Sequence, residues 1–158
     1  MKIILGSDHG GFYLKEEIKK YLEKQKIPYE DIGPFRYDKD DDYPDYTIPV
    51  ALKVAKNKNY KGIIFGFSGQ GELIAANKVS GIRAALYYGG NKEIIKLSRE
   101  HNNSNILSLS GGFLSKKEAI EAIDLWLKTP FTNATRHKRR LKKISNFERK
   151  KLKYNETK

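Results

Sequence analysis

Short apolar runs alternate with amphipathic stretches through the first 130 residues, and this alternation constrains the fold more than any other feature of the chain. The amphipathic stretches have helical spacing, with charged residues between the apolar ones. Strands that alternate with helices predict an α/β fold in which the strands form a parallel sheet of about five strands, covered by helices on both faces. The expected strands are 2–6, 29–32, 61–66, 81–87 and 105–110, and the expected helices are 12–22, 48–55, 72–79, 92–99 and 116–127. The acidic stretch 39–46 contains a proline and is expected to be a loop.

The chain ends in a basic segment that follows Pro130. Residues 136–158 carry +9 of the net charge of +12. A helix is expected over 138–153, with Leu141, Ile144, Phe147 and Leu152 on one apolar face. We therefore divide the chain into a domain of residues 1–130 and a helical arm of residues 131–158, which we expect to pack on a partner subunit. The charge of the arm fits a nucleic acid, an anionic ligand or a solvated surface.

Composition excludes several classes of protein. The chain of 158 residues has 0 cysteines, which excludes disulfides, a thiolate nucleophile and cysteine-bound zinc. No apolar run approaches the ~20 residues of a membrane-spanning helix. The amino terminus, MKIILGSDHGG, has no cleavage site after its short apolar stretch, so it is interpreted as the first strand and the expected compartment is the cytoplasm.

Three polar clusters adjoin the expected strands. They are SDHGG at 7–11, GFSGQGE at 66–72 and REHNN at 99–103. We expect all three to lie on or near one edge of the sheet, where parallel α/β folds bind ligands. The glycines of the second cluster favour a tight turn whose exposed amides bind an anion, although a simple turn explains them as well. This loop is not a P-loop, since no Gly-Lys-Ser/Thr follows it.

Candidate chemical groups lie in or near these clusters. Glu72 begins a helix, where an acid is common for dipole reasons alone, yet beside the loop amides it is also a candidate general base. The chain has three histidines, and all of them lie in polar surroundings; no pair has the helical spacing of metal ligands. Arg136, Arg139 and Arg140 with His137 form either a phosphate-binding group or a solvated basic face.

Taken together, five segments resemble the ribose-5-phosphate isomerase B family, the sugar-phosphate isomerases that also include galactose-6-phosphate isomerase. The segments are SDHGGFYLKEEI, DYPDY, GFSGQGELIAANKVSGIRAAL, REHNNSNIL and RHKRR, and the resemblance runs from Met1 to about Phe147. It implies a Rossmann-like three-layer α/β/α sandwich and a homodimer or homotetramer with shared active sites. It also implies that no metal or cofactor is needed, and that the partner molecules are sugar phosphates and not nucleic acids or membranes.

The resemblance also implies a role for each site residue. Some members of the family use a cysteine at the end of the third strand as the base, but this chain has Gly66 there and resembles the members that use a glutamate. Glu72 would move the proton between C2 and C1. Ser68 and the amides of Gly69, Gln70 and Gly71 would hold the enediolate oxygen, and His101, helped by Asp8, would open the sugar ring. Asn102 and Tyr43 would contact the sugar, while His9, Arg136, His137 and Arg140 would hold the phosphate, the last three from a neighbouring subunit.

Two residues depart from the family pattern. Phe67 occupies a position that is usually glycine, and Gly112 occupies a position at which many relatives have an arginine. The sequence therefore predicts an aldose–ketose isomerase of D-ribose 5-phosphate and D-ribulose 5-phosphate in the pentose phosphate pathway. One alternative is isomerisation of a six-carbon sugar phosphate, such as allose 6-phosphate or galactose 6-phosphate. A second is a nucleic-acid-binding protein that uses the basic tail, although the tail lacks a recognition motif.

Overall fold

The computed structural model describes residues 1–156 of the chain, with side chains described through Lys150. The predicted α/β alternation is confirmed: helices and strands follow one another through the domain. The strands are β1 (Lys2–Ser7), β2 (Tyr29–Asp31), β3 (Tyr60–Gly66), β4 (Ala84–Tyr87) and β5 (Ile106–Ser110). The helices are α1 (Phe12–Lys24), α2 (Pro44–Lys56), α3 (Gln70–Ala76), α4 (Glu93–Glu100), α5 (Lys116–Lys128) and α6 (Thr135–Glu156).

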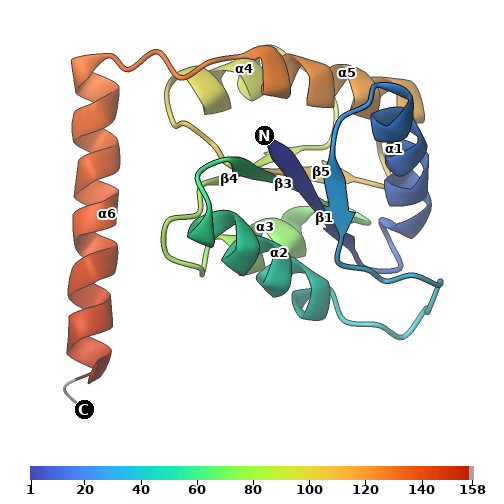
Figure 1. The fold of residues 1–158 in the computed structure, drawn as a ribbon, viewed down its shortest axis with the longest axis horizontal. Coiled ribbons are helices and arrows are strands. Elements are labelled where there is room, and N and C mark those ends of the chain that lie inside the picture. Colours follow the sequence, from blue (N-terminus) through green and yellow to red (C-terminus); the bar gives the residue numbers. More distant parts are fainter. Residues whose placement is uncertain (157–158) are drawn as a thin grey trace.

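The strands form one five-stranded sheet in the order β2-β1-β3-β5-β4, and every neighbouring pair is parallel. Helices α1, α4 and α5 cover one face of the sheet, and α2 and α3 cover the other (Figure 1). The expected three-layer sandwich is thus confirmed. All five strands end at the same edge, which we call the carboxyl edge; the opposite edge, where they begin, is the amino edge.

The core lies on both faces of the sheet because successive strand residues point to opposite sides. Ile3 and Phe65 pack under α1, α4 and α5 in a cluster that includes the fully buried Trp126 of α5. Ile4 and Ile64 pack on the other side against α2. A strand that is buried on both faces must be apolar at almost every position, which is why these strands are continuous apolar runs.

Several predicted boundaries were wrong by a few residues. Helix α2 begins at Pro44, inside the expected acidic loop, because proline is well suited to the first turn of a helix, where its missing N–H is not needed. Helix α3 begins at Gln70, two residues before the predicted start, and ends at Ala76. Strand β4 begins only at Ala84. The residues just before it, Ile82 and Arg83, follow the turn after α3 and lie outside the strand register.

The carboxy-terminal arm is helical from Thr135, three residues earlier than predicted. An extended stretch leads from α5 to α6, which stands to one side of the sandwich (Figure 1). On its predicted apolar face, Ile144 and Phe147 are largely exposed, and Leu152 lies beyond the side chains that the structure describes. No helix in the described part of the chain is both long enough and apolar enough to cross a membrane.

Candidate active site

The carboxyl edge of the sheet brings together residues from three separate parts of the sequence. The loop after β1 supplies Asp8 and His9, and the loop after β3 leads through Ser68 into the first turn of α3, where Glu72 lies. Tyr43 is the residue before α2, and its ring lies against Gly71, since a Cβ on that glycine would be 2.9 Å from the ring carbon Cζ. The strands β1 and β3 are neighbours, and this pairing places their two loops side by side.

Glu72 is 3% exposed, and its carboxyl group lies directly against the backbone of Gly66. A Cβ built on Gly66 would be 2.0 Å from Glu72 Oε1, a distance that no pair of unbonded atoms tolerates. The absence of a side chain at residue 66 is therefore what makes room for the carboxyl group at the end of β3. A side chain at 66 and the present position of Glu72 exclude one another.

The surroundings of Glu72 adjust its acidity toward neutral pH. Burial raises its pKa to about 7, and the nearby carboxylate of Asp8 contributes to the increase. Burial also raises the pKa of Asp8, whose Oδ1 accepts a hydrogen bond from the amide of Gly11 at 3.2 Å. A carboxyl group whose pKa lies near the working pH can both take up and release a proton, which is the property that a general base and acid requires.

His9 is held by an aspartate that the sequence analysis did not single out. Asp41 Oδ1 accepts hydrogen bonds from the His9 amide at 2.9 Å and interacts with His9 Nδ1 at 2.8 Å. This hydrogen bond raises the pKa of His9 and so favours its cationic form. Asp41 lies in the acidic stretch that was expected only to be a loop. Three consecutive aspartates at 40–42 were the available signal for a partner of His9, but sequence spacing does not show which of them reaches it.

The glycine loop presents backbone amides beside Glu72. Gly69 has φ +77°, a left-handed conformation that favours glycine, and it precedes α3. Its carbonyl accepts a hydrogen bond from Ser108 Oγ at 2.6 Å, which fixes the loop to β5. The amide of Gln70 donates to Ser68 Oγ at 3.3 Å. The first amides of a helix have no acceptor within the helix, so this turn can bind an oxyanion.

The third polar cluster, residues 99–103, lies at the amino edge of the sheet. Within a single chain, the expectation that all three clusters share one edge was therefore wrong. His101 and Asn102 follow α4 and precede β5, so they lie where β5 begins. Glu72 lies where the strands end. The five residues of β5 separate the two places by roughly 15 Å at the usual rise of a strand. Within one chain, His101 therefore does not meet Asp8.

The residues of the arm expected to hold phosphate lie beside His101, also at the amino edge. The rings of His101 and His137 have centroids 4.2 Å apart. His137 is 2% exposed, and both of its ring nitrogens have partners: Arg136 Nε donates to Nε2 at 3.0 Å, and Thr132 Oγ1 lies 3.1 Å from Nδ1. Burial lowers the pKa of His137 and so favours the neutral ring. Arg136 and Arg140 are exposed and lie one turn apart in α6.

The two departures from the family pattern, Phe67 and Gly112, are in contact. A Cβ on Gly112 would lie 2.7 Å from Phe67 Cε2, so the aromatic ring rests on the bare backbone of that glycine. The ring also meets Phe113 edge to face, with centroids 5.5 Å apart, and both rings are 61% exposed. The ring of Phe67 occupies the space into which a side chain at 112 would extend.

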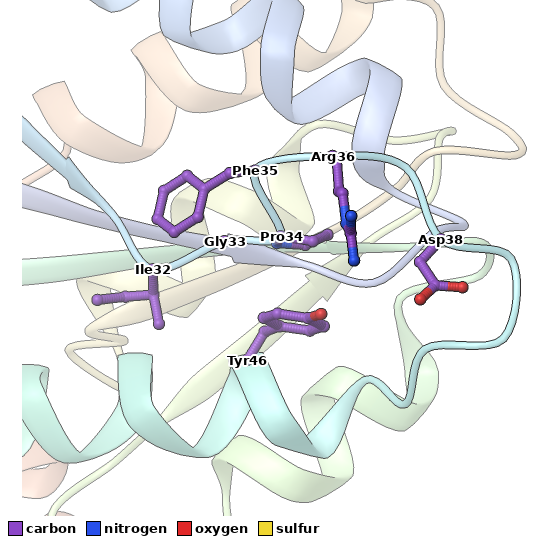
Figure 2. Close-up of a pocket in the computed structure, with 7 residues that line it drawn as sticks. All are labelled: Ile32, Gly33, Pro34, Phe35, Arg36, Asp38 and Tyr46. Atoms are coloured by element: carbon purple, nitrogen blue, oxygen red, sulfur yellow. The ribbon is translucent and has the colours of Figure 1, made fainter.

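A separate hollow of about 460 Å³ lies beside this site, at the loop that follows β2. Figure 2 shows Tyr46 of α2 below the loop, with Gly33, Arg36 and Asp38 on the loop itself. The residues expected to carry the chemistry do not line this hollow. It adjoins the site through Tyr46, whose pKa is raised by burial and by the charge of Asp41.

Comparison with known proteins places the chain in a family. A sequence model described as Ribose/Galactose Isomerase matches residues 3–144. The chain belongs to this ribose/galactose isomerase family. It is 42% identical over 149 residues to ribose-5-phosphate isomerase B of Mycolicibacterium paratuberculosis, an alignment that covers 94% of this chain and 92% of the relative. It is 41% identical to the putative sugar phosphate isomerase YwlF of Bacillus subtilis, with 96% of this chain and 100% of the relative covered.

Structures of the ribose/galactose isomerase family have the same fold. The crystal structure of ribose-5-phosphate isomerase B from Mycoplasma genitalium, with bound ribulose-5-phosphate, matches with a TM-score of 0.88 and 40% identity. The match covers 94% of this chain and 96% of that one. Ribose-5-phosphate isomerase B from Clostridium thermocellum also matches with a TM-score of 0.88, at 41% identity, covering 95% of this chain and 99% of that one.

Proposed function

We propose that this chain is an aldose–ketose isomerase that interconverts D-ribose 5-phosphate and D-ribulose 5-phosphate through an enediolate, as a step of the pentose phosphate pathway. The observation that carries the proposal is the buried carboxyl group of Glu72, with a pKa of about 7, next to the backbone amides at the start of α3. A base and an oxyanion-binding turn in contact are what proton transfer next to a carbonyl requires. The ribulose-5-phosphate bound by the Mycoplasma genitalium relative supports the choice of substrate.

In this mechanism the carboxylate of Glu72 removes the proton from C2 of the aldose and returns it to C1, while the hydroxyl proton of O2 passes to O1, so that the carbonyl moves from C1 to C2. Ser68 and the amides of Gly69, Gln70 and Gly71 stabilise the negative charge that develops on the oxygen. Both steps use one group, because a carboxyl with a pKa near 7 is a base when ionised and an acid after it has taken the proton. The carboxyl of Asp8 lies close enough to Glu72 to raise its pKa.

Substrate contacts on the same chain come from His9 and Tyr43. His9, whose cationic form is favoured by Asp41, is assigned to the phosphate. The ring of Tyr43, fixed against Gly71, is assigned to the sugar.

The remaining site residues are assigned to a second copy of the chain, in a homodimer or a larger homo-oligomer. His101, Asn102, Arg136, His137 and Arg140 lie together at the amino edge, roughly 15 Å from the base in the same chain. A homodimer in which the amino edge of one subunit covers the carboxyl edge of the other would complete two sites at once. His101 of the partner subunit would then open the sugar ring next to Asp8, and the arginines of the partner's arm would hold the phosphate. His137 would act by orienting Arg136, since its own nitrogens are occupied.

A coupled isomerase assay tests the proposal. We expect the purified protein to convert ribose 5-phosphate with a higher kcat/KM than allose 6-phosphate or galactose 6-phosphate. Replacement of Glu72 by Gln should reduce kcat by several orders of magnitude, beyond the ~10²–10⁴ usual for a general base, because no other group is placed to substitute. Turnover of only six-carbon substrates would contradict the choice of substrate, and near-normal kcat in E72Q would contradict the choice of base.

A further inference from the structure

A hollow of about 500 Å³ at the amino edge of the sheet is lined by cations and has no acidic residue in its lining. Lys58, from the turn before β3, and Lys61, from β3 itself, line it, together with Arg83 just before β4. The amide-bearing residues Asn103 and Asn105 complete the polar part of the wall. None of these residues has a role in the proposed isomerase mechanism.

Lys61 has no ion-pair partner among the described residues. Its ammonium lies 5.1 Å from the ring centroid of Trp126, and no acidic residue contributes to its titration within the described part of the chain. Partial burial and the neighbouring guanidinium groups of Arg99 and Arg83 lower its pKa to about 8. At pH 7 the side chain of Lys61 is therefore still mostly charged. A negative charge nearby would stabilise this charged ammonium.

The two arginines near Lys61 are held in place by the backbone. Arg83 Nε donates to the carbonyls of Asn102 at 3.1 Å and Asn103 at 2.9 Å. Arg99 is 7% exposed and donates to the carbonyl of Thr129 and to the carbonyl of Ser104. Because carbonyls carry only partial charge, these bonds fix the guanidinium groups without neutralising them, and the positive charge is pre-organised.

The acid that acts on Arg83 is already engaged by other groups. Glu148 of α6 accepts hydrogen bonds from the amide of Gly81 at 3.2 Å and from Ser80 Oγ at 3.4 Å. It raises the pKa of Arg83, opposing the larger effect of burial, but it does not act on Lys61. The charge inside the hollow is thus left for a ligand.

We propose that this hollow is a binding site for a small tetrahedral oxyanion, either inorganic phosphate or the phosphate group of a monoester, held mainly by Lys61, Lys58 and Arg83. In its own chain the hollow lies at the amino edge of the sheet, away from Glu72 at the carboxyl edge. Its lining also shares no residue with the group that the proposed dimer assigns to the partner's site, which is His101, Asn102, Arg136, His137 and Arg140. Its volume of about 500 Å³ leaves ample room for a phosphate group with a substituent.

The protein contains its own reporter for this binding. Trp126 is the single tryptophan of the chain, and its indole Nε1 donates to Ser104 Oγ at 2.7 Å. It is fully buried with Lys61 above its ring, so an anion that binds Lys61 changes the local electric field without changing solvent exposure. We expect its fluorescence to change in a saturable way when phosphate replaces chloride at constant ionic strength.

Variants separate this hollow from other anion sites. Lys61→Met keeps the apolar stem that covers Trp126 and removes the charge, so phosphate affinity should fall about tenfold or more. Lys58→Met should also weaken phosphate binding, and it replaces Lys61→Met as the test if Lys61→Met does not fold. Thermal unfolding will show whether each variant is folded. Lys56→Met removes an exposed lysine of α2 outside the lining and should leave affinity within about twofold. Arg140→Ala removes a phosphate contact of the proposed substrate site, so it should leave the phosphate dependence of Trp126 fluorescence unchanged even if calorimetry detects a change at that other site.

Glycerol 3-phosphate as a second probe distinguishes the two sources of the anion: tighter binding than inorganic phosphate indicates a monoester, and equal or weaker binding indicates the free ion. The proposal is overturned if neither fluorescence nor calorimetry detects saturable binding at constant ionic strength. It is also overturned if Lys61→Met and Lys58→Met, both folded, bind phosphate as the unaltered protein does.

Discussion

Gly66 provides a direct test of whether the position of the Glu72 carboxyl controls turnover. In Gly66→Ala the added methyl would lie 2.0 Å from Glu72 Oε1 if nothing moved. Normal contact requires about 3.5 Å, so the carboxyl must retreat by at least about 1 Å. A displacement of this size at a catalytic group costs on the order of 100-fold. We therefore expect kcat for ribose 5-phosphate to fall about 100-fold, with little change in KM.

The matched control is Gly62→Ala, on the same strand and the same face of the sheet. There the new methyl would lie 2.8 Å from Ile106 Cγ1, which is a core contact away from the carboxyl edge. This overpacking should lower the free energy of unfolding by about 1–3 kcal/mol, with kcat changed less than twofold. Both variants would be compared by a coupled assay at saturating substrate and by thermal unfolding. If folded Gly66→Ala keeps kcat within about threefold of the unaltered protein, the reasoning from carboxyl position to turnover is refuted.

Three other predictions follow from the same geometry. Burial raises the Glu72 pKa from 4.5 to about 7, so the ionised carboxyl destabilises the folded protein above pH 7. The free energy of unfolding of E72Q should therefore be about 1–3 kcal/mol higher than that of the unaltered protein above pH 7, and the difference should disappear below pH 4.5. Urea titrations that show no such pH dependence would contradict the raised pKa. Gly112→Arg must displace the Phe67 ring, so a double-mutant cycle with Phe67→Gly should give a coupling of about 0.5–1 kcal/mol in the free energy of unfolding. The coupling is modest because Phe67 is 61% exposed and its ring can turn away. Additive effects would mean that the two positions are independent. Co-refolding inactive E72Q with inactive Arg136→Ala/Arg140→Ala should restore activity in heterodimers, and proven heterodimers without activity would mean that each chain supplies its own phosphate contacts.

Much of the fold could be predicted because its signal is local. Five apolar runs separated by helical stretches are enough to require a parallel sheet with helices on both faces, since each run must be buried on both sides. The glycine loop and the helix that begins near Glu72 are equally local, because backbone conformation and helix starts depend on neighbouring residues. Boundaries were less certain, as the start of α2 at Pro44 illustrates.

The arrangement of the site could not be predicted from local pattern. His101 was assigned to the same edge as Glu72, but a residue between a helix and the following strand lies where that strand begins, and only the assembled sheet shows which edge that is. The contact of His9 with Asp41 joins residues 32 apart in the sequence, and three neighbouring aspartates are indistinguishable until the loop has folded.

The sequence by itself therefore determined the class of fold, the family resemblance and the chemical groups available, because these depend on residue type and on short spacings. Tertiary structure decided how those groups are distributed: the carboxyl of Glu72 occupies the space left by Gly66, the ring of Phe67 covers Gly112, and His101 lies at the opposite edge from the base. The physical reason is that burial, pKa and steric exclusion arise from atoms that are distant in the chain and become neighbours only when the sheet and its helices pack.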